Sequence, residues 1–498
     1  MHIEKEGKDT LMRLAVVGSF LIAILHSILF YGQELGISVF LFCIALGFFI
    51  IYILEKCKKI KNKKALILCV PILLISATYF IFNNSFFYVA NIFALIILFV
   101  VMIISALFEK TTLGLIINRA IYLLFGPIEF IEEAIGSIVD NIVVLFSKKE
   151  ISEEKNGKIR KIIVGIVIAI PILIVILVLL ASADSIFSKE LGEVISTIFS
   201  LDIFESETYI HLFFRAIIVI IITVYLIALL YNILEDDFTK KDTKEERNWT
   251  VDSTIGNTIL TILNLVYLVF CYIQISVLFM QAGNMENFDY ASYARQGFFQ
   301  LMAVSVINLI IILVTSKRNE IQKKMSYTKV MNLCLALFTL IILFSSFYRM
   351  YLYEQEYGYT FLRLMVYFAL ITEAILIIPT VMYILGIKIN LTKTYFVVII
   401  IMYIIVNYIN IDNVIAKKNI DRYFEDTSGS YELDTSYLGT LGIDAAGQIK
   451  RLENVEENNI DTEVRYYLSN VRAEVNDMTL QSFNINKWIA KRELKNNY

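Results

Sequence analysis

Long apolar runs constrain this chain more than any other feature of its sequence. About 20 consecutive apolar residues are enough to cross a bilayer as a helix. Hydrophobic residues make up 58% of the 498 residues and charged residues 18%, whereas soluble domains are about 45–50% apolar. We therefore predict an all-α fold, a polytopic transmembrane helix bundle. The predicted spans are Leu14–Phe30, Leu35–Leu54, Ala65–Phe82, Val89–Phe108, Ile162–Leu180, Leu212–Leu234, Ile255–Phe279, Phe298–Val314, Val330–Tyr348, Phe361–Leu385 and Tyr395–Ile411.

Basic residues indicate how these spans are threaded, because cytoplasmic loops carry an excess of Lys and Arg. With the N-terminus in the cytoplasm, 28 of the 44 basic residues fall in cytoplasmic segments and five fall in the outer loops. The other 11 follow Ile411. The distribution predicts an N-terminus inside and a C-terminus outside. No small-residue cleavage site follows the first run, which indicates an uncleaved first span.

Two segments between the spans have amphipathic patterns. Residues 128–145 place isoleucines at helical spacing, and four acidic residues fall largely on another face. Four acids make a full crossing costly, so we predict a helix lying on the cytoplasmic surface. If this segment crossed the membrane, every later loop would lie on the opposite side of the membrane from the one predicted. Residues 185–199 have a similar apolar stripe and predict an interfacial helix on the outer face.

These patterns divide the chain into four regions. Residues 1–110 form a four-span membrane region, residues 111–158 a cytoplasmic amphipathic segment, and residues 159–411 a seven-span membrane core. Residues 412–498, here called the tail, carry 11 basic and 15 acidic residues. Within the tail, Asp434 precedes apolar residues at helical spacing, which predicts a helix start. We expect a small helical extracytoplasmic domain docked on the outer face of the membrane.

Composition and motifs exclude several functional classes. A net charge of −3 without a concentrated basic face argues against a nucleic-acid partner. Five cysteines without a CxxC pair and three histidines without ligand spacing predict neither a disulfide framework nor a metal site. The chain has no phosphate-binding glycine loop and no nucleophile elbow. We therefore predict no cofactor and no metal, and we assign no catalytic residue.

Arginines gather at the predicted outer ends of the spans, where basic residues are normally scarce. Two of them bound the polar, tyrosine-rich stretch Arg349–Arg363, which we predict to link two spans. Snorkelling with ion pairs to outer acids is one interpretation. The other is a basic outer pocket for a phosphate or carboxylate group, because guanidinium groups suit planar anions. The arginines are Arg215, Arg295, Arg349 and Arg363, and the outer acids are Asp184, Asp289, Glu354 and Glu356.

Glu373 is the acid placed most deeply in any of the apolar runs, about 12 residues into its span. A buried acid in a membrane is costly, and this makes a functional site the default hypothesis. Glu373 could relay protons or coordinate a cation with polar partners such as Asn264, Asn308 or Asn332. A protonated glutamic acid bonded across a helix interface is the alternative, and both remain open.

The stretch Asn407–Tyr423 is predicted to continue the last span outward as one helix. Asp412, Ala416 and Asn419 recur at helical spacing on one face of it. A structural hinge to the tail is favoured over a ligand site here. The predicted hinge residues are Asn410, Asp412, Asn419 and Arg422.

Several short stretches match a family pattern in order along the chain. They are Ala181–Asp184, Tyr293–Leu301, Arg349–Tyr353, Tyr357–Thr360, Asn410–Arg422, Leu433–Leu438 and Asp444–Ala445. With these stretches the chain resembles the bacterial polytopic membrane proteins of the domain of unknown function 4173 and its close relatives. Gly442 and Gly447 stand where that pattern would have serine and proline. The resemblance implies a multi-pass protein of the bacterial cytoplasmic membrane, and it implies no activity and no catalytic residue.

Three functional hypotheses follow. The first is a non-enzymatic protein of the cell envelope that binds an anionic lipid or glycan, or another membrane protein, at its outer face. The second is a secondary transporter that uses Glu373. The third is a membrane-embedded transferase for a lipid-linked substrate that uses the outer acids. The first is favoured, and the substrate and oligomeric state are not determined by the sequence.

Overall fold

The computed structural model consists of α-helices and short 3-10 helices, and no strand occurs in the part of the chain that it describes. The described residues are 2–146, 176, 180, 187, 189–190, 207–235, 238, 253–280, 297–316, 326–427, 431–453, 455 and 458–495. They divide into two compact units. Unit 1 is Met1–Phe80, Val89–Thr243 and Thr479–Phe483, and unit 2 is Ile81–Tyr88, Lys244–Met478 and Asn484–Tyr498. The all-α fold predicted from the sequence is confirmed.

Unit 1 is built from the helices of the N-terminal half. They are α1 (His2–Phe30), α2 (Ile37–Lys56), η1 (Lys63–Leu68), α3 (Cys69–Ile81), α4 (Ser85–Leu107), α5 (Leu113–Phe125), η2 (Gly126–Phe130), α6 (Ile131–Phe146) and α9 (Glu207–Leu234). Helices α1 and α9 pack along each other. Ala23 and Ala228 are fully buried, and such small side chains let two membrane helices approach closely.

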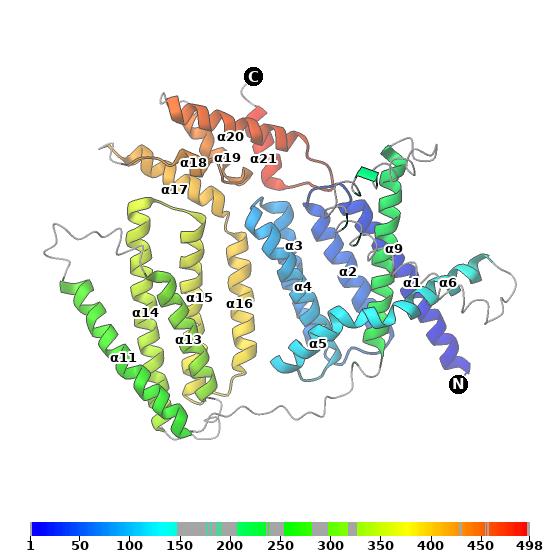
Figure 1. Cartoon of the computed structure of the whole chain (residues 1–498), viewed down its shortest axis with the longest axis horizontal. Helices are drawn as coiled ribbons and strands as arrows, with labels where there is room; N and C mark the ends of the chain where they lie inside the picture. Colours follow the sequence, from blue (N-terminus) through cyan, green and yellow to red (C-terminus); the bar gives the residue numbers. More distant parts are fainter. Residues whose placement is uncertain are drawn as a thin grey trace. The chain divides into compact units, whose positions relative to one another are not determined.

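Helices α5 and α6 run crosswise to α4 and α9 within unit 1 (Figure 1). They are held at the end of α9, where Asn232 Nδ2 donates to the Tyr122 carbonyl over 2.7 Å and Tyr231 is hydrogen-bonded to Ser137. Leu113–Val139 is nevertheless long and apolar enough to cross a membrane. The placement of residues 128–145 on the membrane surface stays a prediction.

Unit 2 combines five long helices with the tail. The long helices are α11 (Ser253–Met280), α13 (Phe298–Ser316), α14 (Tyr327–Tyr357), α15 (Phe361–Ile384) and α16 (Leu391–Tyr408). The tail contains α17 (Ile411–Glu425), α18 (Thr435–Leu438), η6 (Ile443–Ala445), α19 (Ala446–Ile449), η7 (Lys450–Leu452), α20 (Asn458–Asn476) and α21 (Ile485–Lys495). The tail helices cross the end of the bundle where α14 ends and α15 begins (Figure 1). We call this the tail end of unit 2.

Ten of the eleven predicted spans correspond to described helices. The remaining one, Ile162–Leu180, lies outside the described residues except for Ile176 and Leu180, and so does almost all of residues 185–199. Within the described residues the structure contains 11 helices that are long and apolar enough to span, because Leu113–Val139 is counted among them.

Two predicted boundaries are wrong. The link Arg349–Arg363 is not a loop: α14 continues to Tyr357, because Met350 and Glu354 keep a buried face along the helix. Only residues 358–360 connect α14 to α15. The last span and the hinge are also not one helix. Ile409 is extended, and the Asn410 side chain accepts a hydrogen bond from the Asn413 N–H over 3.2 Å, so it caps a new helix, α17.

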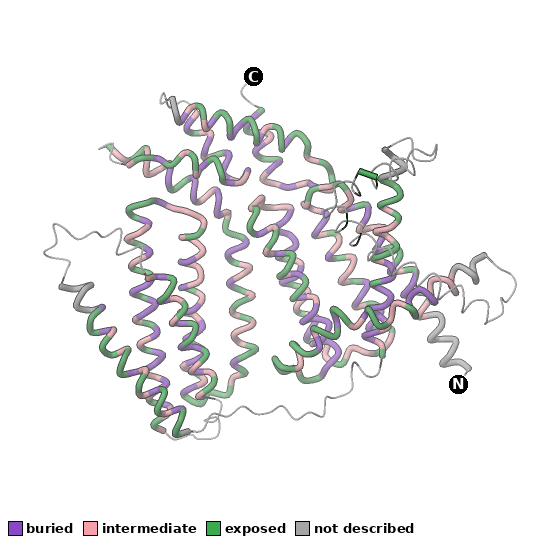
Figure 2. The backbone as a smooth tube through the Cα atoms, in the orientation of Figure 1, coloured by how far each residue is buried: buried purple, intermediate pink, exposed green. Residues whose placement is uncertain are grey.

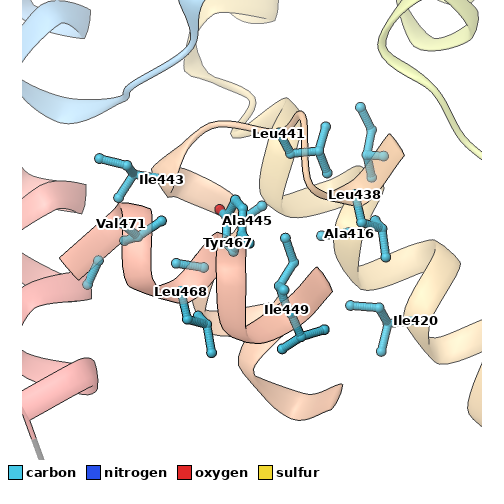
Figure 3. Close-up of a cluster of buried hydrophobic side chains, with 14 of the residues drawn as sticks. Ala416, Ile420, Leu438, Leu441, Ile443, Ala445, Ile449, Tyr467, Leu468 and Val471 are labelled. Carbon is cyan, nitrogen blue, oxygen red and sulfur yellow. The ribbon is translucent and has the colours of Figure 1, made fainter. Parts of the chain in front are cut away.

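The tail has an apolar core of its own. Its buried positions lie where α17, α19 and α20 face one another (Figure 2). Figure 3 shows side chains of this core, among them Leu438, Ile449 and Leu468. Asp434 Oδ1 accepts from the Tyr437 N–H over 2.8 Å and caps α18, which confirms the helix start predicted there. Tyr359 and Phe361, at the α14–α15 connection, pack against the same core. These contacts hold the tail against the long helices of unit 2.

Candidate functional site

The α14–α15 connection is a short turn that α17 holds in place. The Asn419 side chain accepts from the Tyr359 N–H over 2.8 Å and donates to the Tyr359 carbonyl over 2.8 Å. Gly358 has φ +73, a conformation that suits glycine. A Cβ there would lie 2.6 Å from Asn419 Oδ1 and 2.7 Å from the Tyr431 hydroxyl. Only a glycine at position 358 therefore lets α17 pack this closely against the turn.

Two arginines bind the carbonyl groups that end α14. Arg422 donates to the carbonyls of Glu354 and Gln355, the former over 3.4 Å. Arg363 donates to the Tyr357 carbonyl over 2.9 Å and to the Gly358 carbonyl. The last carbonyls of a helix lack intrahelical partners and carry the negative end of its dipole, so two cations are stabilised at this position.

Each of these arginines also lies over a tyrosine ring. The guanidinium carbon of Arg363 is 4.3 Å from the ring centroid of Tyr353, and that of Arg422 is 4.3 Å from the ring centroid of Tyr431. Such stacking holds a guanidinium group without removing its charge. We call Arg363, Arg422, Tyr353, Tyr431 and the buried Glu354 the arginine–tyrosine cluster.

Glu354 is 5% exposed and its hydrogen bonds come from neutral groups. Its carboxylate accepts from the Tyr367 hydroxyl over 3.1 Å and from Gln355 Nε2 over 3.3 Å. Burial, together with the hydrogen bond to Glu354, raises the pKa of Tyr359 to about 12. Tyr359 is therefore neutral at physiological pH and donates its proton toward this carboxylate.

The predicted outer arginines and acids fall in different places. Arg349 donates to Gln274 Oε1 over 3.2 Å. Arg215 belongs to unit 1, where its Nε donates to Ser27 Oγ over 3.2 Å. Glu356 is exposed on α14. Arg295, Asp184 and Asp289 lie outside the described residues.

The structure brings together residues that the sequence treats as separate groups. Arg363 and Glu354, from the predicted outer cluster, meet Asn419 and Arg422, from the predicted hinge, around one turn. Tyr431 and Tyr437 complete this site, and the Tyr437 hydroxyl accepts from the Phe361 N–H over 2.7 Å. No local sequence signal points to either tyrosine, because both depend on how the tail folds back.

Glu373 lies in the middle of α15, where it is 8% exposed and accepts a hydrogen bond from Ser305 of α13. Of its predicted partners, Asn308 lies one turn from Ser305 and donates to Thr339 Oγ1 over 3.1 Å. Asn264 donates to the Met331 carbonyl over 3.0 Å. The predicted intramembrane residues therefore lie in different helix contacts: Glu373 joins α15 to α13, Asn308 joins α13 to α14, and Asn264 joins α11 to α14. Ser305, which the sequence did not single out, is the residue that donates a hydrogen bond to Glu373.

A second polar site in unit 2 fixes the α3–α4 connection to the tail. Asp444 accepts from the Asn83 N–H through both carboxylate oxygens, over 3.0 and 2.9 Å. Asp412 accepts from Asn84 Nδ2 over 2.9 Å and from the Gly442 N–H over 3.2 Å. We call these two acids and their donors the carboxylate clasp.

Burial sets the acidity of the clasp. It raises the pKa of Asp444 to about 6 and also raises the pKa of Asp412, while hydrogen bonds oppose the shift in each case. Gly442 stands in the clasp where the family pattern predicted serine. A Cβ there would lie 2.4 Å from the Asn83 carbonyl oxygen, so the close contact requires glycine.

These features define a class of protein. The long helices expose large apolar side chains, such as Phe48 at 72% and Phe344 at 66%, which suits a lipid environment and not water. Within the described residues, no three His, Cys, Asp or Glu side chains are grouped so that they could hold a metal ion. The molecule is a multi-pass, all-helical membrane protein.

The chain belongs to the family of the domain of unknown function DUF4153, whose model matches residues 69–452. The sequence resemblance had indicated the domain of unknown function 4173, so the family number is corrected while the broad description, a multi-span membrane protein without an assigned activity, is retained. No curated protein and no solved structure matches the chain.

Proposed function

We propose that this protein acts at the cell envelope without catalysing a reaction, and that it binds an anionic group of an envelope lipid or glycan at the tail end of unit 2. The arginine–tyrosine cluster is the site. A phosphate or carboxylate is the group that guanidinium donors bind best, because two parallel N–H groups match two oxygens.

The observation that carries this proposal is a pair of arginines without an ion pair. Among the described residues neither Arg363 nor Arg422 forms a salt bridge, and the nearby Glu354 takes its hydrogen bonds from Tyr359, Tyr367 and Gln355. The partners of both arginines are carbonyl oxygens and tyrosine rings, which leave the positive charges in place. Arg363 Nε is buried without a hydrogen-bond partner.

The electrostatics of Tyr431 support a shared positive potential. Burial raises the pKa of the Tyr431 hydroxyl, the charges of Arg422 and Arg363 both act to lower it, and the charge of Asp434 has a smaller effect in the opposite direction. Both guanidinium groups therefore lie close enough to act on one point. An anion at that point would interact with two cations in surroundings that water screens poorly.

The test is native mass spectrometry of the intact protein released from its membrane in a mild detergent. We expect a bound phospholipid or polyprenyl phosphate. Arg363→Gln should weaken its binding at least about tenfold, or about 1.4 kcal/mol, because it removes a charge and a planar pair of donors. Arg363→Lys keeps the charge but not the planar group, so its affinity for the lipid should lie between those of the wild type and Arg363→Gln. Arg349→Gln shows whether the more distant arginine contributes.

Arg465→Gln is the matched control, since this tail arginine is exposed and paired with Asp461. Thermal melting of each variant shows whether the fold is intact. Unchanged lipid binding in a folded Arg363→Gln protein would exclude the site, and a wild-type protein that carries only another protein would favour a scaffold.

A further inference from the structure

Helix α5 of unit 1 has its charge inside and its apolar side chains outside. Arg119 is its one charged residue and is buried, whereas most of the helix is exposed (Figure 2). The exposed large apolar side chains recur at helical spacing and continue into η2. They form a strip that we call the apolar arc: Leu113, Ile117, Ile121, Leu124, Phe125 and Ile128. Asn118 and Tyr122 are exposed beside this arc and form a polar edge.

Aromatic rings hold the opposite face of α5 against the rest of unit 1. The guanidinium carbon of Arg119 lies 5.7 Å from the ring centroids of Tyr122 and Phe238. It lies 6.0 Å from the ring centroid of Phe108. Leu123, one turn further along the same face, is 2% exposed. These contacts fix the rotation of α5 about its axis, so the apolar arc is turned away from the core of unit 1.

The position of α5 is set by the ends of long helices. It begins six residues after Leu107, where α4 ends, and its Tyr122 carbonyl accepts from Asn232 in the last turn of α9. With 13 residues it is about 20 Å long, too short to cross a hydrocarbon core of about 30 Å. Long apolar helices end where acyl chains meet headgroups, and an apolar arc beside such ends suits that boundary.

Lysines are concentrated at the same end of unit 1. Residues 55–64, which join α2 to η1, contain six lysines and one glutamate. Lys59 Nζ donates over 2.9 Å to the Leu234 carbonyl, at the end of α9. The Lys61 N–H donates over 2.9 Å to the Ala106 carbonyl, near the end of α4. The basic segment is therefore fixed to the two helices whose ends set the position of α5.

Much of this positive charge is exposed. Lys61 and Lys64 are exposed, and Lys63 pairs with Glu55 over 3.6 Å. The acids of η2 and α6 come after the end of α5 and are Glu129, Glu132 and Glu133. An anionic phospholipid combines acyl chains, which an apolar arc binds, with a headgroup that lysines near the membrane surface attract.

We propose that α5 is an in-plane membrane anchor that binds anionic phospholipids, with their acyl chains against the apolar arc and their headgroups at the lysines of residues 55–64. In the threading predicted from the sequence, this is the cytoplasmic leaflet. A second copy of the chain suits the surface less well, because a symmetric contact would bring like charges together. The inference concerns unit 1 and does not depend on anion binding at the arginine–tyrosine cluster of unit 2.

The first experiment measures the depth of α5 in a bilayer. The full chain, with its two native tryptophans replaced by phenylalanine, is reconstituted in phosphatidylcholine vesicles whose acyl chains carry bromine at a shallow or a deep position. Leu113→Trp and Phe125→Trp should be quenched from depths that agree within about 5 Å, whereas a crossing helix would separate them by about 18 Å. Asn118→Trp, on the polar edge, should be quenched less by deep bromines than Ile121→Trp.

The second experiment measures the choice of lipid beside α5. Fluorescence of Ile121→Trp is compared in phosphatidylcholine vesicles with a minor fraction of brominated phosphatidylglycerol or of brominated phosphatidylcholine. The anionic lipid should bind beside the tryptophan at least about tenfold more tightly. Lys61→Gln combined with Lys64→Gln should remove most of this preference. Lys417→Gln combined with Lys418→Gln is the matched control, because it removes the same charge from exposed positions of α17, and it should retain the preference.

Three results would overturn the proposal. Absence of quenching in Ile121→Trp would show that protein, such as a second copy, covers the apolar arc. Depths that differ by about 18 Å would show that α5 crosses the bilayer. Equal binding of the two brominated lipids would show that the lysines select no headgroup. Arg363→Gln should leave the lipid preference unchanged, so this site and the arginine–tyrosine cluster can fail separately, and thermal melting shows that each variant is folded.

Discussion

At the residue scale, single contacts decide how the tail is held. Gly358 and Asn419 are the best example. In the turn between α14 and α15, the N–H and the carbonyl of Tyr359 both form hydrogen bonds with the Asn419 side chain. The sequence showed a Tyr-Gly-Tyr-Thr stretch, Tyr357–Thr360, but not that a residue 60 positions beyond Tyr359 would bind it. Such a pairing depends on three-dimensional folding and leaves no local pattern.

Gly358→Ala should loosen the tail. The alanine would need the φ of +73 and would place a Cβ 2.6 Å from Asn419 Oδ1, so we expect the free energy of unfolding to fall by about 1–3 kcal/mol. Thermal melting in detergent and trypsin cleavage of the tail measure this. Gly47→Ala is the control, because the nearest atom to its added Cβ lies 3.7 Å away. Equal melting temperatures for both variants would contradict the assigned role of Gly358.

At the element scale, short segments connect helices that are distant in sequence. The α3–α4 connection enters the carboxylate clasp between α17 and η6, so a turn near residue 83 depends on the tail. The charge of Asp412 and a hydrogen bond from Asn486 act on Asp444, and Asp444 in turn acts on Tyr467. Nearby in the tail, Lys487 pairs with Glu474 over 2.8 Å. The sequence offered Asp412 as a hinge residue, and the structure shows it as an acceptor in this clasp.

The clasp should give the tail a pH dependence. The pKa of Asp444 is raised from 3.8 to about 6, so the native state holds the proton more tightly than the unfolded state. The corresponding contribution to stability is present below about pH 4 and is lost as the pH rises to about 6. Asp444→Asn should remove this change and should be more stable than the wild type at pH 7, by at most about 3 kcal/mol.

Melting curves of the detergent-solubilised protein between about pH 4 and about pH 8 test this expectation. Asp461→Asn serves as the control, because Asp461 pairs with the exposed Arg465 on the surface of α20 and such pairs contribute little. If wild type and Asp444→Asn showed the same pH profile, the carboxyl group of Asp444 would not control the clasp.

At the scale of the whole molecule, the chain does not divide where its apolar runs suggest. Ile81–Tyr88 belongs to unit 2 although α3 and α4 lie mostly in unit 1, and Thr479–Phe483 of the tail belongs to unit 1. Within unit 1, the Phe483 carbonyl accepts from the Ile37 N–H over 3.1 Å at the start of α2. Exchanged segments of this kind are set by backbone hydrogen bonds, which composition does not reveal.

The predicted threading can be tested in intact cells. Ser469→Cys, exposed on α20, should react with a membrane-impermeant thiol reagent, because the tail is expected outside. Lys388→Cys, exposed in the α15–α16 connection, should react only after lysis. Both changes are made in a background without the five native cysteines. The reverse pattern would show that the chain is threaded in the opposite direction.

The sequence by itself determined the helical membrane class and the position of most spans, because a bilayer requires long uncharged helices and these are visible in one dimension. It also identified Glu373 and the arginines as unusual, since charges near or within a membrane are costly. It did not determine that Arg363 and Arg422 meet at the end of α14, that Ser305 contacts Glu373, or that Asn83 and Asn84 enter the clasp. Only the tertiary structure decided these pairings, because each joins residues far apart in the chain through packing of the helices and the tail.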